Sequence, residues 1–413
     1  MTLPRIIALD NSIRDYAWGS PAAIPALLGI EPSGRPAAEL WVGAHPDSPS
    51  RWTAHPDRPG LDELIEQAPA ELLGTATVRR FGPRLPFLVK VLAADRALSM
   101  QVHPALEQAQ AGYAAEQAAG LVPGAPGRNY TDANHKPELA YALSDFDAFC
   151  GFRPVADTAR LLDALAVDEL SRFRDLLMGP DGLRATFTAL LSLRGEVRDQ
   201  LVAETLTGCR RLSLGDGSWS AAARASLLAG EDFPGDIGAV LALLLNHVRL
   251  APGEAIFLGA GNVHAYLRGT CVEVLANSDN VLRCGLTPKH VDVAELVRIA
   301  DFSPLAEPRW QPEQAADGEV RFRVPVPDFV LDVVALTDRP HPVTGAGPYL
   351  VLAGEEPATV RAGDLVERTE PWHAVFLAAR QDGEPAGSLT GSGRAFLVSC
   401  DTSDRLSGAL AKI

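Results

Sequence analysis

The chain contains little cysteine, and its cysteines form no pattern that is typical of a metal site or a disulfide framework. Its 413 residues include five cysteines, which are scattered and odd in number. No two of them form a Cys-x-x-Cys pair, the usual spacing in a cysteine zinc site. We therefore expect free thiols, a reducing cytoplasm as the compartment, and no cysteine-ligated metal.

Long apolar runs and an excess of positive charge are also missing. The sequence has no run of 18 apolar residues, and residues 1–7 lack the apolar core of a signal peptide, so we expect no membrane segment. The 37 Lys and Arg residues stand against 52 Asp and Glu residues, a formal net charge of −15. This charge argues against nucleic acid or an anionic membrane as a partner. An anionic substrate would need a local basic cluster.

What is present indicates a folded protein of several parts. The apolar fraction is 47% and the charged fraction 22%, and the length exceeds one typical core, which predicts two or three domains. Short apolar runs broken by Gly and Pro predict strands in residues 5–60, 250–290 and 310–413. The last of these regions shows no evident reactive constellation. Apolar residues at helical spacing predict helices in residues 61–80 and 155–248. The polar, Ala/Gln-rich segment at residues 105–119 is also predicted to be helical, and residues 292–299 resemble a short helix.

One short stretch, residues 98–103, carries an alternating pattern directly after an apolar run. If it is a strand, Ser99, Gln101 and His103 share one face, and the apolar residues between them share the other. The apolar face would pack on a core, and the polar face would line a cavity where Gln101 and His103 can reach one metal ion. An ordinary half-exposed strand explains this stretch equally well.

Two further stretches place pairs of polar side chains on one strand face. Lys136 and Glu138 are two residues apart, with Pro137 between them at a position that suits a strand start or an edge. His264 and Tyr266 form the second pair, after a Gly-rich turn. The recurrence of this pattern favours a shared site over three unrelated surface strands.

Together these stretches supply donors for a divalent metal such as zinc. Imidazole and carboxylate are usual zinc ligands, and a catalytic site leaves a position for water or substrate. A glutamine ligand is less common, and its neutral oxygen would leave the metal more electrophilic. A single histidine on a strand is more often structural than ligating, so the prediction depends on the whole set: Gln101, His103, Glu138 and His264.

Three cations stand near these stretches, in loops or at strand edges: Lys136, Arg283 and Lys289. Loops carry function more often than cores do. Lys289 taken alone is most simply a solvated surface charge. As a set beside a metal, the three suit a phosphate or another anion, for which Arg offers bidentate geometry and Lys a point charge.

Six stretches, in order, resemble the type I phosphomannose isomerase family, also called mannose-6-phosphate isomerases. Each stretch alone is moderately specific, and the combination is strong. The resemblance covers nearly the whole chain and weakens in residues 155–235 and after residue 310. The matching stretches are residues 16–20, 38–46, 98–104, 135–138, 261–266 and 278–289.

The resemblance implies a mainly β fold built on a cupin-type double-stranded β-helix, or jelly roll. This catalytic domain would comprise residues 1–153 and 249–308. An inserted α-helical domain would comprise residues 154–248, and a second, C-terminal cupin-like β domain residues 309–413. We expect a cytoplasmic monomer.

The resemblance also implies the site and the reaction. One zinc ion per subunit would be held by the four ligands above, with Arg283 as the catalytic arginine, Lys136 and Tyr266 lining the pocket, and Ser99 and Lys289 binding phosphate. The reaction would interconvert D-mannose 6-phosphate and D-fructose 6-phosphate through a cis-enediol. Zinc and Arg283 would stabilise the developing negative charge.

The proton-transferring base stays open between three groups. Lys136, deprotonated beside the metal and Arg283, is one candidate and is our choice as a catalytic residue. Glu138 is less suitable if it ligates the metal, and a metal-activated water is the third. Lys136→Met should cut turnover while zinc is retained.

Two other functions fit parts of the pattern. A non-catalytic sugar-phosphate-binding cupin, a sensor or scaffold, would need the anion-binding cations but no proton-transfer group. A metal-dependent cupin oxygenase generally has an iron site richer in histidine than the two in this set. An assay for fructose 6-phosphate formed from mannose 6-phosphate separates the isomerase from both.

Overall fold

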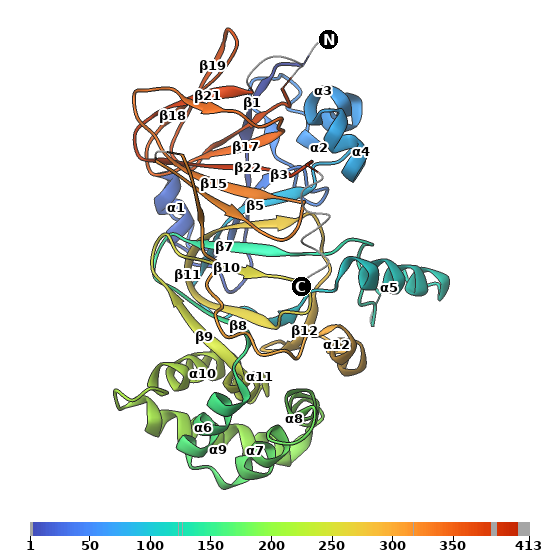
Figure 1. The fold of residues 1–413 in the computed structure, drawn as a ribbon, viewed down its shortest axis with the longest axis vertical. Coiled ribbons are helices and arrows are strands. Elements are labelled where there is room, and N and C mark those ends of the chain that lie inside the picture. The colour runs from blue at the N-terminus through green and yellow to red at the C-terminus, as the bar shows by residue number, and fades with distance from the viewer. Residues whose placement is uncertain (1–2, 123, 126, 317, 381–385, 404–413) are drawn as a thin grey trace. The chain divides into compact units, whose positions relative to one another are not determined.

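The computed structural model describes residues 3–122, 124–125, 127–316, 318–380 and 386–403. The chain forms two compact units. Unit 1 comprises Met1–Ala93, Val272–Asn277 and Trp310–Ile413, and unit 2 comprises Ala94–Cys271 and Ser278–Arg309. Both units contain antiparallel strands, and Figure 1 shows the sheets together with the helices. The mainly β class predicted from the sequence is confirmed at this level.

The larger sheet of unit 1 combines both ends of the chain. Its strand order is β13-β14-β15-β22-β17-β20-β1-β4, and β1 pairs antiparallel with β20 through Ile7 and Phe376. A four-stranded sheet of order β16-β21-β18-β19 belongs to the same unit. Apolar residues of both sheets, such as Val334, Val351 and Val360, form one buried cluster. The alternation of these residues along each strand explains why one face is buried.

The strands of the larger sheet are β1 (Ile6–Asp10), β4 (Arg51–Trp52), β13 (Glu313–Ala316), β14 (Glu319–Arg323), β15 (Val330–Ala335), β17 (Tyr349–Ala353), β20 (Ala374–Leu377) and β22 (Arg394–Ser399). Those of the smaller sheet are β16 (His341–Val343), β18 (Ala358–Ala362), β19 (Leu365–Thr369) and β21 (Gly387–Gly391). The remaining elements of unit 1 are β2 (Ser12–Arg14), β3 (Glu39–Gly43), β5 (Phe87–Ala94), α1 (Ala23–Leu28), α2 (Leu61–Gln67), α3 (Pro69–Leu73) and α4 (Thr75–Phe81).

Unit 2 holds strands that pair mainly around β11 (His264–Ala276), whose last residues belong to unit 1. Strands β6 and β8 pair with β11, β12 pairs with β6, β9 with β8, and β10 with β7. The bounds are β6 (Met100–Val102), β7 (Glu138–Ala142), β8 (Phe146–Phe152), β9 (Leu245–Leu250), β10 (Ala255–Leu258) and β12 (Leu282–Gly285).

The helices of unit 2 include a bundle formed by the middle of the chain (Figure 1). Its apolar faces share a buried cluster with Met100 and Val102, so the apolar side of the 98–103 stretch packs on a core as predicted. The helices are α5 (Leu106–Ala118), α6 (Val155–Leu165), α7 (Ser171–Leu177), α8 (Gly182–Leu191), α9 (Gly195–Ser213), α10 (Ser220–Asp232), α11 (Gly238–Leu241) and α12 (Val293–Ile299).

Several boundaries differ from those that the sequence predicted. The predicted strand at residues 98–103 is limited to Met100–Val102, and His103 lies just beyond it. The helical region ends before residue 248, because Leu245–Leu250 forms β9 and pairs with β8. The three-part domain division stays a prediction, and the two compact units group residues 1–93 with residues 310–413 instead. None of the helices in the described ranges is long and apolar enough to cross a membrane.

Candidate active site

Three adjacent strands of unit 2 place three predicted site residues in one row. His264 on β11 lies opposite Gln101 on β6, and Gln101 lies opposite Arg283 on β12. Residues directly opposite one another in antiparallel strands send their side chains to the same face. The pairing therefore brings together two residues that are 163 and 182 positions from Gln101 along the chain.

The predicted metal ligands gather at one end of this row. The ligand atoms of His103, Glu138 and His264 lie within 4.8 Å of one another, and all three residues are buried. His103 Nε2 is 3.5 Å from Glu138 Oε1, and His264 Nε2 is 3.4 Å from Glu138 Oε2. The amide Nε2 of Gln101 lies 3.3 Å from His264 Nε2. All four predicted ligands therefore converge on one small volume.

Both histidine rings are oriented by main-chain carbonyl groups. His103 Nδ1 is 2.7 Å from the oxygen of Asn280, and His264 Nδ1 is 2.9 Å from the oxygen of Asn262. A carbonyl oxygen only accepts hydrogen bonds, so each Nδ1 carries the proton and donates it. Each Nε2 is then left with a lone pair that points to Glu138, the arrangement found for histidines that bind metals.

The protonation states match those that a metal requires. Burial lowers the pKa of His103 to about 4, which keeps the ring neutral at pH 7. Burial alone would raise the pKa of Glu138, but the Lys136 ammonium holds it well below its usual range. His103 Nε2 and Glu138 Oε2 are buried without a hydrogen-bond partner in the described structure. A neutral His103 imidazole, the Glu138 carboxylate and their two unpartnered atoms fit a divalent metal.

The other predicted residues lie at different depths around this centre. Lys136 is buried directly before β7, and its Nζ contacts Glu138 Oε1. Tyr266 is buried, with its ring centroid 6.2 Å from that of His264. Ser99 is half-buried just before β6. The contact of Ser99 with phosphate stays a prediction.

Arg283 and Lys289 form a pair of cations at the other end of the row. Burial lowers the pKa of the half-buried Arg283, and the charge of Arg283, followed by burial, lowers the pKa of Lys289. Lys289 is exposed in the loop after β12. A cation that lowers the pKa of a neighbouring cation favours an anion between them, because an anion relieves the repulsion.

Sequence reasoning missed the network that holds the loops around the metal ligands. The fully buried side chain of Asn280 donates from Nδ2 to the carbonyl oxygens of Asp132 and Asn134, at 2.8 and 2.7 Å. Its Oδ1 accepts from the Thr131 amide at 2.8 Å. The Asp132 carboxylate in turn accepts from Ser278 Oγ at 2.9 Å. This network ties the loop before Lys136 to the loop that orients His103.

A buried charge cluster in unit 1 was also missed. Lys90 Nζ lies 3.3 Å from Glu39 Oε1 and 3.5 Å from Glu273 Oε2, and all three side chains are at most 9% exposed. Trp41 donates from Nε1 to Glu39 Oε2 at 2.7 Å and lies with its ring 5.0 Å from Lys90. The sequence contains a feature that indicates this cluster, because Lys90 interrupts an otherwise apolar run at residues 85–92.

Comparison with known proteins identifies the class to which this fold and site belong. Residues 6–155 match the family profile described as phosphomannose isomerase type I, catalytic domain. The mannose-6-phosphate isomerase of Escherichia coli (strain K12) is 40% identical over 379 residues, which cover 90% of this chain and 95% of that protein. The rat mannose-6-phosphate isomerase is 34% identical over 80% of this chain and 82% of its own length.

Solved structures agree along nearly the whole chain. A zinc-bound mannose 6-phosphate isomerase is 37% identical, with a TM-score of 0.87, and the match covers 96% of this chain and all of that one. The Salmonella typhimurium enzyme bound to fructose 6-phosphate and zinc gives the same identity, TM-score and coverage. This chain belongs to the mannose-6-phosphate isomerase family, which confirms the resemblance found in the sequence.

Proposed function

We propose that this chain is a zinc-dependent aldose–ketose isomerase that interconverts D-mannose 6-phosphate and D-fructose 6-phosphate. The observation that carries the proposal is the buried convergence of His103, Glu138 and His264, with each histidine oriented by a main-chain carbonyl. This site lies in a chain that belongs to the corresponding family along most of its length. A relative bound to both zinc and fructose 6-phosphate supports the same assignment.

Four side chains would hold the zinc ion. His103 and His264 offer Nε2 and Glu138 offers its carboxylate. Gln101, whose amide lies beside His264, offers Oε1 once the amide is turned by half a rotation. Bound there, zinc supplies a Lewis acid that stabilises negative charge on the substrate oxygens. The burial of these donors strengthens every electrostatic interaction at the site.

The chain's own residues would move the proton. In the open-chain aldose, Lys136, deprotonated beside the metal and Arg283, would accept the proton from C2, which leaves the former C1 carbonyl oxygen as an enediolate oxygen. The proton of the neighbouring C2 hydroxyl would pass to this oxygen through the cis-enediol. Lys136 would then return its proton to C1 as the C2–O bond becomes the ketone. Arg283, in the same row as Gln101, holds a fixed positive charge beside the enediol oxygens. The contact of Lys136 with Glu138 orients its amine for this transfer.

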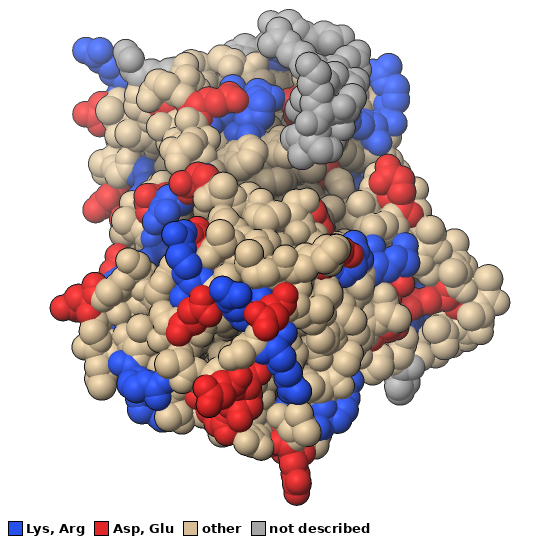
Figure 2. All heavy atoms as spheres, turned by 60° about the horizontal axis from the view of Figure 1, so that its bottom comes forward, with Lys and Arg blue, Asp and Glu red and all other residues tan. Residues whose placement is uncertain are grey.

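The phosphate would bind at the outer end of the site. Lys289 is exposed near Arg283, and a dianionic phosphate offsets the charges of both. Ser99 adds a hydroxyl donor, and Tyr266 forms part of the wall. On the face shown in Figure 2, Lys and Arg side chains are interspersed with Asp and Glu. Such a mixed surface does not suit a nucleic acid or an anionic membrane, whereas a small sugar phosphate fits the local pair of Arg283 and Lys289.

The architecture and cellular setting complete the proposal. Residues 1–153 and 249–308 would form the catalytic cupin-type jelly roll, and residues 309–413 a second, C-terminal cupin-like domain. The helices of residues 154–248 would be inserted in the first. None of the five cysteines, all of which lie in the described ranges, is joined in a disulfide bond, which supports a reducing cytoplasm. We propose that the chain acts there as a monomer.

A coupled assay tests the function directly. The purified protein, loaded with zinc, is given mannose 6-phosphate, and fructose 6-phosphate is measured as it forms. We expect turnover that is lost in His264→Ala and retained in His247→Ala, a matched control whose histidine binds Asp147 outside the site. A zinc-loaded protein that binds mannose 6-phosphate without turning it over would be a sugar-phosphate-binding protein, and the proposal would be wrong.

A further inference from the structure

The C-terminal part of unit 1 contains a second cavity, of about 710 Å³. Its volume lies within the range of about 300–1,000 Å³ that is usual for small-molecule sites. Its floor is one face of the larger sheet, and its rim includes β16 and the segment after it. All of the lining residues belong to unit 1, whereas the proposed metal ligands all belong to unit 2.

The floor of the cavity is built from alternate residues of neighbouring strands. Glu319, Arg321 and Arg323 are two apart on β14, so their side chains share one face. Arg321 lies opposite Asp332 on β15, and Asp332 lies opposite Leu397 on β22. This sheet face therefore carries charged side chains next to apolar ones. Its charged side chains line the cavity.

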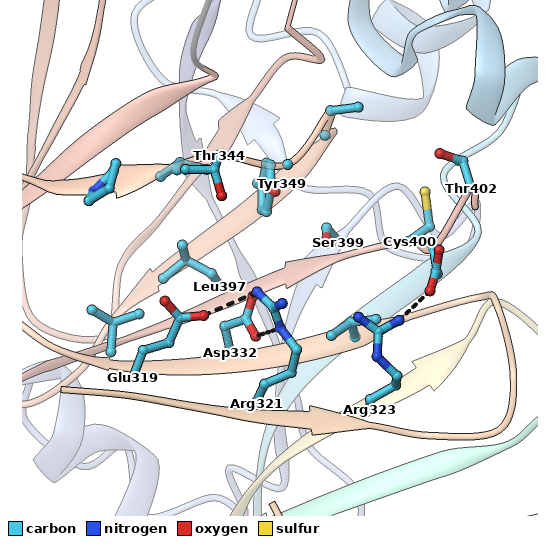
Figure 3. Close-up of a pocket in the computed structure, with 18 of the residues that line it drawn as sticks. Glu319, Arg321, Arg323, Asp332, Thr344, Tyr349, Leu397, Ser399, Cys400 and Thr402 are labelled. Atoms are coloured by element: carbon cyan, nitrogen blue, oxygen red, sulfur yellow. Dashed lines mark hydrogen bonds and ion pairs between the residues drawn. The ribbon is translucent and has the colours of Figure 1, made fainter. Parts of the chain in front are cut away.

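These charged groups are arranged as ion pairs. Arg321 donates to Asp332 through two bonds of 2.6 and 3.0 Å and to Glu319 at 3.1 Å. Glu319 also lies 3.1 Å from His341 Nε2, and Arg323 contacts the Asp401 carboxylate. Figure 3 shows Glu319 and Asp332 turned toward Arg321 along the floor. The groups hold each other in place before any ligand arrives.

The chemistry of the wall selects the kind of ligand. Each arginine already has a carboxylate partner, and the four lining carboxylates outnumber the two arginines, so an anion such as phosphate is disfavoured. A cation would have to compete with the arginines for the same carboxylates. A hydroxyl both donates and accepts, so adjacent hydroxyls match alternating guanidinium and carboxylate groups.

Further lining groups fit the same ligand. Hydroxyl groups of Thr344, Tyr349 and Ser399 lie around the cavity (Figure 3). Val330 and Leu397 add apolar area against which the C–H face of a sugar ring can pack. A wall with paired charges, hydroxyls and some apolar area suits a neutral polyhydroxylated molecule.

We propose that this cavity is a second binding site, separate from the metal centre, for a neutral hexose or polyol. The ligand binds through adjacent hydroxyls to the Glu319–Arg321–Asp332 ion pairs. This inference goes beyond the proposed isomerase function and does not depend on it, since the two sites share no residue.

The test uses the zinc-loaded full chain with fructose 6-phosphate at saturation, so that the metal centre is occupied. D-Mannose, D-glucose and D-mannitol are titrated in turn, with calorimetry and ligand-observed NMR as readouts. We expect at least one of them to bind at one site per chain. Isomerase activity is measured separately, so an inactive protein would contradict the proposed function without affecting the measurement of polyol binding.

Two variants locate the binding. Arg321→Gln removes the central donor, and Thr344→Trp places a large side chain at the exposed rim. Each should weaken binding of the polyol at least about tenfold, a change equivalent to the loss of one charge-assisted hydrogen bond. Thr337→Trp, an exposed threonine of the same unit outside the cavity, is the matched control and should bind normally. If Arg321→Gln fails to fold, Thr344→Trp decides.

Three results would overturn the proposal. The first is that none of the three polyols binds. The second is that Thr344→Trp leaves binding unchanged, which would locate it elsewhere. The third is that inorganic phosphate or spermidine binds in the cavity in preference to the polyols.

Discussion

The Nδ1–H group of His103 donates to the main-chain oxygen of Asn280 across a distance of 2.7 Å. Both residues are fully buried. The Asn280 side chain holds the loop at residues 131–134 through the hydrogen bonds described above. One residue thus orients a proposed zinc ligand through its main chain and anchors a neighbouring loop through its side chain.

We predict that Asn280→Ala weakens zinc binding. Without the side chain, the carbonyl that orients His103 is no longer held, and loss of such outer contacts typically costs about 10–100-fold in metal affinity. The measurement is zinc affinity by competition with a chelator. Excess zinc should restore part of the activity.

Asn246→Ala is the matched control for that variant. Asn246 Nδ2 contacts four main-chain oxygens, including that of Leu305 at 2.9 Å, outside the metal centre. It should lower stability and leave zinc affinity unchanged. Equal zinc affinity in Asn280→Ala and the parent protein would contradict the positioning role.

Metal removal should abolish activity reversibly. Dialysis against a strong chelator should leave protein without turnover, and added zinc should restore it. Because zinc binds only the folded site, the zinc-loaded protein should also unfold at a higher temperature than the stripped protein. Turnover that persists in protein shown to be metal-free by elemental analysis would exclude the metal from the reaction.

Lys136→Met should lower kcat by roughly 10²–10⁴-fold, the usual contribution of a proton-transfer group. Zinc content should be retained, because Lys136 is not a ligand. Lys289→Met provides the comparison, since removing a phosphate contact should mainly raise KM. An unchanged kcat in Lys136→Met would assign the proton transfer to another group.

Lys90→Met should destabilise unit 1 strongly. The substitution leaves Glu39 and Glu273 buried without their cation, and breaking a buried pair in this way costs about 3–5 kcal/mol. Urea unfolding followed by circular dichroism measures the loss. Adding Glu39→Gln and Glu273→Gln to the same chain removes the uncompensated charges and should recover part of the stability. A single variant as stable as the parent would show that the cluster is already solvated.

Glu295→Gln should lower the free energy of unfolding at neutral pH but not at acidic pH. Hydrogen bonds from Arg298, and then from the Tyr130 hydroxyl, hold the pKa of Glu295 below its usual range despite partial burial. A carboxyl whose pKa is lowered on folding contributes stability above its unfolded pKa and loses it as the pH falls through the folded value. We expect a difference in the free energy of unfolding that is present at pH 7 and shrinks as the pH falls below the usual range of a glutamate. A difference that does not change with pH would contradict the ionic contribution.

Much of the site could be predicted from the sequence because strands repeat every two residues. The spacing of Gln101 and His103, of Lys136 and Glu138, and of His264 and Tyr266 marked the polar faces. The alternation also indicated that Met100 and Val102 face a core. Both belong to the buried cluster that they share with the apolar faces of the helical bundle. The order of six short stretches identified the family, which the relatives confirm.

Other features depend on contacts between distant parts of the chain. No local pattern distinguishes Leu245–Leu250 from the end of an apolar helix, and it is pairing with β8 that makes it a strand. The partner of Lys90 and the lining of the C-terminal cavity likewise follow from strand register. Region 310–413 showed no constellation in sequence because Arg321 and Asp332 meet only when β14 pairs with β15.

The sequence by itself determined which side chains share a strand face, which segments form helices, and to which family the chain belongs, because these depend on local periodicity and short motifs. The tertiary structure decided which faces meet. It placed Gln101 between His264 and Arg283, aligned His103 on the carbonyl of Asn280, and turned three charged residues of β14 toward a cavity. Register between strands far apart in the chain sets these contacts, since a shift of one residue would send every side chain to the opposite face.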